Sequence, residues 1–334
     1  ELSGINNLLN GSRIYLFDLN DKEATNLGVD SFFVNNQIFE KIKPVSFSAF
    51  VKNYSTRSVD NSVASLFING KRSAQQSFSA SAGQSIKLNF ETTLADTGLV
   101  EAYVELEDDD INQDNKRFTC FYVPDKINVL ILTDNPGDAQ FIKLALNNAG
   151  SQTFSISENY ASQIASLNLL KYNAIILIGQ DIMSGGNKLL NYLESGNGII
   201  LMPGSKSSIA SMRSLFETLT LPPPSVFIGL QNSSKNSAGF GKVDLQNPLF
   251  KDIFENNSKL KIDSPEIFYY AKINPGISGK TIISMNDNSA FLSEYKIGAG
   301  KILVFNSAPV LSSGTFPLKS LFAPLVNKSV LYIS

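Results

Sequence analysis

The sequence predicts two folded parts, an N-terminal antiparallel β-sandwich followed by an α/β domain with a mostly parallel sheet. Its 334 residues suffice for two ordinary domains, each with its own core. The sequence pattern changes near residue 125. Before it, short runs alternate apolar and polar residues; after it, continuous apolar runs alternate with helical patterns. We therefore expect domains at 31–125 and 126–334, with residues 1–30 belonging to neither.

The region before residue 125 has the pattern of strands that are buried on one face. In "PVSFSAFVKNY" (44–54), Val45, Phe47, Ala49 and Val51 fall on the same side of a strand. The next run, "SVASLFING", ends in Asn-Gly at 69–70, which is a strong hairpin signal. Evenly spaced strands with turn signals between them are typical of a β-sandwich. Further strands are expected at 85–93, 98–107 and 116–123.

The region after residue 125 alternates strands with helices. The run "INVLILTD" (127–134) is continuously apolar, as expected of a strand that is covered on both faces. This alternation predicts a mostly parallel sheet with helices on both sides. Further strands are expected at 153–158, 173–179, 199–204, 280–286, 290–298 and 301–308, and helices at 135–150, 187–198, 207–219 and 316–334.

Composition excludes several classes of function. The net charge is −2, so no basic surplus is present to bind nucleic acid, and no apolar run is long enough to span a bilayer. The first residues lack the charged and apolar regions of a signal peptide, which suggests a soluble piece of a longer chain. The sequence contains no His, so neither a Ser-His-Asp nor a Cys-His-Glu triad can be assembled, and zinc sites that use His are excluded.

The motifs and their order resemble known modules. "VSFSAFVKNY", "LFINGK" and "AGQS" resemble the CARDB type of Ig-like domain. "VLILTD", "YNAIILIG", "LLNYLESGNGIILMPG" and "YKIGAGKILVF" resemble the class I glutamine-amidotransferase-like, flavodoxin-like fold in its non-catalytic form. This order is similar to that of bacterial membrane proteins with an aerotolerance-regulator (Bat-type) N-terminal domain. The resemblance implies that residues 1–30 are the exit of an upstream von Willebrand factor A-like domain.

The carboxyl ends of the predicted parallel strands form the first candidate site. Ligands of open α/β sheets bind outside these ends, where Thr133, Asp134 and Asn135, then Gln180 and Asp181, and then Ser205 are expected. In catalytic amidotransferases, the resemblance implies, a Cys would stand at the turn that here reads Pro-Gly-Ser. The only Cys, Cys120, is predicted to be a small buried residue of the sandwich. The alternative is that these polar residues simply begin loops.

The acidic run "DDDINQD" is the second candidate site. Asp108, Asp110, Asn112 and Asp114 have the spacing of calcium loops. However, Gln113 stands where such a loop needs Gly, and the bidentate Glu is missing. We therefore favour a solvated hairpin loop over a calcium site, and we expect no other cofactor.

These observations lead to an expected function. We expect a non-catalytic, extracytoplasmic scaffold of a bacterial membrane-anchored protein, with protein partners and a role in envelope assembly or stress tolerance. The soluble part would face the periplasm, and membrane contact would come only through segments outside this sequence. The alternative is a small-molecule-binding or hydrolase-like α/β domain that uses the crevice at the strand ends. The oligomeric state is left open.

Overall fold

The computed structural model describes residues 24–147, 153–179, 185–235, 237–251, 253 and 262–334. The described chain divides into two compact units. The first contains residues 24–36, 42–94 and 99–122, and the second contains residues 37–41, 95–98 and those from 123 onward. The change of pattern near residue 125 thus lies within a few residues of the observed division.

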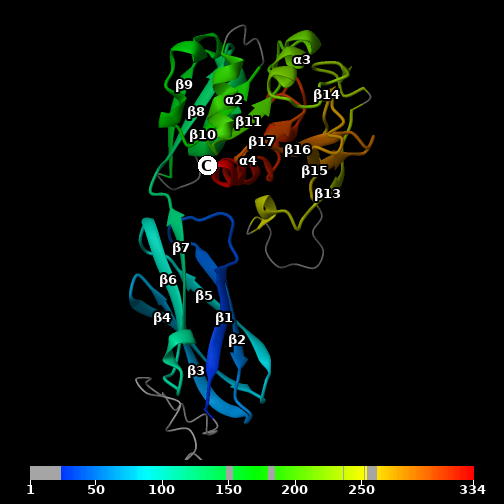
Figure 1. Ribbon diagram of the computed structural model, residues 1–334. Coiled ribbons are helices and arrows are strands. Elements are labelled where there is room, and N and C mark those ends of the chain that lie inside the picture. The colour runs from blue at the N-terminus through cyan, green and yellow to red at the C-terminus, as the bar shows by residue number, and fades with distance from the viewer. Residues whose placement is uncertain (1–23, 148–152, 180–184, 236, 252, 254–261) are drawn as a thin grey trace, which may run out of the picture. The chain divides into compact units, whose positions relative to one another are not determined.

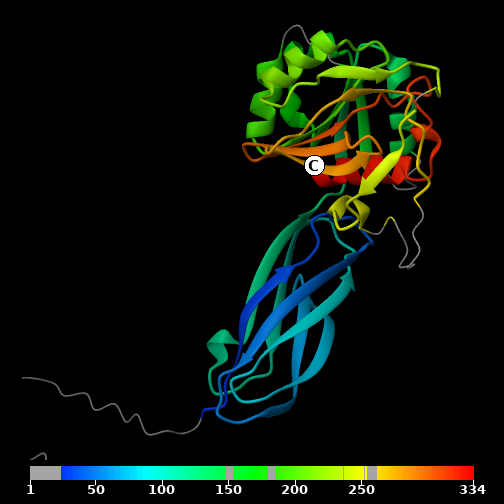
Figure 2. The same cartoon turned by 90° about the vertical axis from the view of Figure 1, so that its right-hand side faces the viewer.

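The first unit is an antiparallel β-sandwich, as predicted (Figure 2). One sheet has three strands in the order β1-β2-β5, and the other has four in the order β4-β3-β6-β7. The strands are β1 (Leu27–Val34), β2 (Pro44–Asn53), β3 (Val59–Ile68), β4 (Lys71–Ala80), β5 (Ser85–Thr93), β6 (Gly98–Leu106) and β7 (Lys116–Val123).

The predicted inward face of β2 is confirmed. Val45, Phe47, Ala49 and Val51 are each at most 1% exposed, because their alternation places all four toward the opposite sheet. The predicted hairpin is confirmed as well. The two residues between β3 and β4, Asn69 and Gly70, have φ of 48° and 76°, the left-handed conformation that this turn requires.

Two predictions for the first unit are wrong in detail. The sandwich begins at Leu27 in β1, before the expected boundary at residue 31; residues 1–23 of the expected 1–30 segment lie outside the described residues. Cys120 is exposed rather than buried. Strand β7 is apolar on both sides, and it turns Phe121 and Val123 inward, so Cys120 lies on the outer face.

The second unit is built on an eight-stranded mixed sheet, with order β13-β15-β16-β17-β11-β10-β8-β9 (Figure 1). Strands β9, β8, β10, β11 and β17 are parallel; read by order of appearance they run 2-1-3-4-5, the flavodoxin-like order. The other three extend the sheet antiparallel, and β12 pairs with β14 separately. The bounds are β8 (Ile127–Thr133), β9 (Phe154–Asn159), β10 (Ala174–Ile178), β11 (Gly198–Met202), β12 (Val226–Gly229), β13 (Phe240–Val243), β14 (Tyr269–Lys272), β15 (Gly279–Met285), β16 (Ala290–Ile297) and β17 (Gly300–Phe305).

Helices cover both faces of this sheet, as predicted. Apolar residues of α1 (Gln140–Asn147) and α4 (Phe322–Ile333) share one core cluster, and those of α2 (Gly186–Glu194) and α3 (Ile209–Thr218) share the other. Every residue of β10 and β11 is buried between these layers. Polar residues that flank β10 and β11 in the sequence therefore lie at the ends of these strands. Among the described residues, no helix combines the length and hydropathy needed to cross a membrane.

Candidate functional site

The turn after β11, which reads Pro-Gly-Ser, is tightly packed. Gly204 is buried there, and its backbone lies directly against that of Gly179, which follows β10. A Cβ on Gly204 would stand 3.0 Å from Oδ2 of Asp138 and 3.1 Å from Cα of Gly179. A larger residue at position 204 would displace one of these neighbours. The close contact between the two turns therefore requires glycine at this position.

The turn presents Ser205 to a buried carboxylate. Asp138 is 4% exposed and lies in the 3-10 turn Pro136–Ala139 that follows β8. Its Oδ2 accepts hydrogen bonds from the Ser205 backbone N–H at 2.7 Å and from the Ser205 Oγ at 3.1 Å. The Asn135 Nδ2 donates to Oδ1 of Asp138 at 2.9 Å and to the Ser205 Oγ at 3.0 Å. These three residues, Asn135, Asp138 and Ser205, are called the elbow cluster below.

The side chains of the elbow cluster hydrogen-bond mainly to one another. The carboxylate of Asp138 receives three protein donors, and the Ser205 hydroxyl both donates and accepts within the cluster. The backbone oxygen of Ser205 accepts a further bond from the Gln231 side chain. A carboxylate is too weak a base to take a proton from a serine hydroxyl, and the chain has no imidazole to do so. The arrangement therefore fixes the orientation of the Ser205 hydroxyl.

The structure brings together only part of the predicted crevice. Asn135 and Ser205 meet in the elbow cluster, and Thr133 lies beneath them, exchanging hydrogen bonds with the backbone of Asn135. Asp134 is exposed and turns away; its Oδ1 accepts from the Ser162 N–H at 3.3 Å. Gln180 and Asp181 lie outside the described residues.

The sequence alone does not single out Asp138, the central residue of the elbow cluster. The stretch 135–150 is predicted only as a helix, in which Asp138 has no assigned role. A usable signal was present, because Asp138 follows three residues after Asn135, directly beyond a buried strand and within the first turn of a helical segment. At that position a short acidic side chain can reach a neighbouring strand end.

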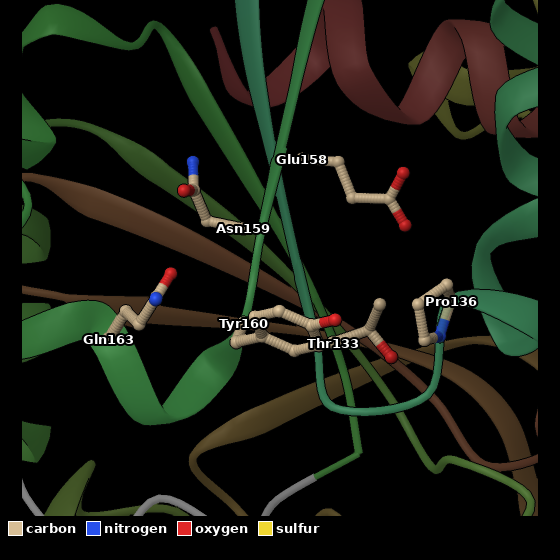
Figure 3. Close-up of a pocket in the computed structure, with 6 residues that line it drawn as sticks. All are labelled: Thr133, Pro136, Glu158, Asn159, Tyr160 and Gln163. Carbon is tan, nitrogen blue, oxygen red and sulfur yellow. The ribbon is translucent and has the colours of Figure 1, made fainter.

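A pocket of about 320 Å³ lies beside the elbow cluster, at the carboxyl ends of β8 and β9 (Figure 3). It shares the Thr133–Pro136 turn with the elbow cluster, and its other walls come from the end of β9 and the segment after it. The lining residues are Thr133, Pro136, Glu158, Asn159, Tyr160 and Gln163.

The acidic run uses most of its carboxylates to hold the entry to β1. The Asp109 Oδ2 accepts from the Leu27 N–H at 2.7 Å, and the Asp110 Oδ2 accepts from the N–H and hydroxyl of Thr25 at 2.8 and 2.9 Å. The Asp114 Oδ2 accepts from the Asn26 Nδ2.

The predicted calcium residues thus have different surroundings. Asp108 is exposed, and the Asn112 Oδ1 accepts from the Asp109 N–H within the loop. In the part of the chain that the structure describes, no group of three or more His, Cys, Asp or Glu residues is arranged to hold a metal. Calcium binding by Asp108, Asp110, Asn112 and Asp114 stays a prediction.

The comparisons with known proteins concern the fold. Neither protein-family models nor curated proteins gave a match to the sequence. Among solved structures, the chain is similar to a cytoplasmic protein of Salmonella typhimurium LT2, STM1381, with TM-score 0.50 and 12% identity over 62% of this chain and 100% of that one. A second Salmonella typhimurium cytoplasmic protein, STM3548, gives TM-score 0.47 and 13% identity, again over 62% of this chain and 98% of the other.

A further similarity is to the CARDB domain of the PF1109 protein from Pyrococcus furiosus, solved in complex with di-metal ions. The TM-score is 0.28 with 16% identity, over 31% of this chain and 97% of that one. At 12% identity, the similarity to STM1381 bears on the fold and on nothing further.

Proposed function

We propose that this chain is a non-catalytic interaction region of a bacterial membrane-anchored protein. It would bind protein partners on the extracytoplasmic side, in envelope assembly or stress tolerance, and reach the membrane only through segments outside this sequence. The order of an Ig-like sandwich and an amidotransferase-like domain supports this proposal through its resemblance to the Bat-type membrane proteins.

The observation that carries the proposal is a row of aromatic rings on the outer face of the four-stranded sheet. Phe67 of β3 stacks on Tyr103 of β6, with ring centroids 4.7 Å apart and planes at 6°. Tyr103 in turn contacts Phe118 of β7 at 5.1 Å. Phe118 is 60% exposed although it is large and apolar. The three residues are called the aromatic row below.

The surroundings of the aromatic row resemble those of a protein-binding surface. Leu99 and Tyr122 are also exposed, at 73% and 63%, and the alternation along the neighbouring strands β6 and β7 places them on the same outer face as Tyr103 and Phe118. An ion pair of Lys116 with Glu105, 2.6 Å long, lies on this face too. Aromatic side chains beside polar groups are typical of interfaces, and contiguous exposed apolar surface is unusual in a monomer.

We propose a non-catalytic role because of the geometry of the elbow cluster. In the catalytic fold that this unit resembles, a nucleophile occupies the turn, whereas Ser205 here is bonded to Asp138 and the sequence contains no His to act as its general base. Purified protein should leave glutamine and simple esters unchanged. Turnover that disappears in Ser205→Ala would contradict the proposal.

The interaction surface is tested by capture of partners from an envelope extract of the source bacterium. The amount of partner captured by the double variant Tyr103→Ser/Phe118→Ser should fall at least about tenfold, because central aromatic residues contribute most of the binding energy of an interface. The matched control is Phe33→Ser, because Phe33 is also an exposed aromatic residue, 43% exposed, on the other sheet. Equal loss in both variants, or retention in the double variant, would refute the assignment of this surface.

A further inference from the structure

The pocket beside the elbow cluster contains polar side chains without protein partners. Within the described residues, the side chains of Asn159, Tyr160 and Gln163 form no hydrogen bond with the protein, although each lines the cavity. The two amides each offer a donor and an acceptor, and the phenol offers both. In the elbow cluster next to them, by contrast, each of the three side chains is bonded to another protein group, so the difference is local rather than a general property of the strand ends.

The pocket also offers apolar surface. The ring of Tyr160 is 52% exposed, and the ring of Pro136 and the side chain of Thr133 stand near it. Figure 3 shows Tyr160 and Thr133 between the amides of Asn159 and Gln163 on one side and Glu158 and Pro136 on the other. A bound molecule would therefore contact a flat apolar face and a rim of hydrogen-bonding groups at once.

The charges around the pocket disfavour an anion and leave little attraction for a cation. The Glu158 carboxylate is paired with the Lys143 ammonium at 2.7 Å, so its charge is largely balanced. Asp134 is a further acidic group, at the end of the neighbouring strand β8, and among the described residues no Arg or Lys lines the cavity. The carboxylate of Glu158 retains a second oxygen that can accept a hydrogen bond.

We propose that this pocket binds an uncharged polyhydroxyl ligand of monosaccharide size. Hydroxyls on opposite edges of such a ligand would donate to Glu158 and accept from the amides of Asn159 and Gln163, while its C–H face would pack on Tyr160. The cavity lies at the low end of the range of about 300–1,000 Å³ found for small-molecule sites, which suits a single sugar ring. This inference is independent of the partner-binding function proposed for the aromatic row.

The test measures binding of neutral monosaccharides to the full chain, and NMR of the sugar detects the binding. The probes are glucose, galactose and mannose, with glucosamine and glucuronate as the cationic and anionic counterparts. At least one neutral sugar should bind with a Kd of about 1 mM or tighter, and more tightly than either charged sugar. Tyr160→Ala and Gln163→Ala should each weaken this binding about tenfold.

Tyr122→Ala is the matched control, because it removes an equally exposed tyrosine outside the pocket and should leave sugar binding unchanged. The proposal is overturned if none of the neutral sugars binds, if a charged sugar binds better, or if Tyr160→Ala and Gln163→Ala bind as well as the original protein. Unchanged melting temperatures of the variants would show that any loss comes from the pocket. Partner capture by the aromatic row is a separate measurement. Failure of sugar binding would therefore leave the proposed partner binding intact, and failure of partner capture would leave the sugar site intact.

Discussion

The elbow cluster and the pocket lie side by side at the same end of one sheet, yet they differ in how their polar groups are satisfied. In the elbow cluster, Asp138 and Ser205 bond to each other and to Asn135. In the pocket, the amides of Asn159 and Gln163 face the cavity without protein partners. Buried polar groups that are mutually bonded stabilise the fold, whereas unpaired groups around a cavity are available to a ligand. Three sets of variants test this difference.

The largest effect is expected from Asp138→Ala. This change removes a buried acceptor of three hydrogen bonds, so the free energy of unfolding should fall by about 3 kcal/mol. Urea denaturation measures it. Asp134→Ala is the matched control: Asp134 is an exposed aspartate of the same turn and accepts only one long bond, so the loss should stay under about 0.5 kcal/mol. Equal losses would show that the elbow cluster is not a stabilising unit.

A smaller effect is expected from Gly204→Ala. The added Cβ would press on the Asp138 carboxylate and on the Gly179 backbone, which should cost about 1–2 kcal/mol in thermal or urea unfolding. Gly137→Ala is the control in the adjacent turn, since its Cβ would meet only Asn135 Oδ1, at 3.6 Å. A Gly204→Ala protein as stable as Gly137→Ala would contradict the close approach of the two turns.

The smallest effect on stability is expected in the pocket. Asn159→Ala and Gln163→Ala remove side chains that have no protein hydrogen bonds, so the free energy of unfolding should change by less than about 0.5 kcal/mol. The same urea titrations measure it. A loss comparable to that of Asp138→Ala would mean that these amides support the fold, and the distinction between the two regions would fail.

The fold follows from the sequence more completely than the site does. The run at 127–134 and the Asn69-Gly70 turn predict their elements because burial on both faces and positive φ each restrict the residue types strongly. Strand β7 shows the limit: both of its faces are apolar, so alternation alone does not say whether Cys120 or Phe121 points inward.

The site depends on contacts between segments that are distant in the sequence. Local sequence patterns do not predict such contacts. Ser205 and Asp138 are 67 residues apart, and their bond requires the order of β8, β10 and β11 in the sheet. Asp134 and Asp138 look equivalent in the sequence, but only Asp138, in the 3-10 turn after β8, bonds to the turn that follows β11. Residue type therefore predicts at which end of the sheet polar side chains gather, and the backbone geometry decides which of them meet.

The carboxylate under the turn also limits what protein engineering can achieve here. A thiol introduced by Ser205→Cys would sit against the negative charge of Asp138, which disfavours the thiolate and raises the thiol pKa. Such a protein would hold this thiol in its protonated, unreactive form. A reactive thiol at this turn would therefore require exchange of Asp138 as well as Ser205, so the two positions must be redesigned together.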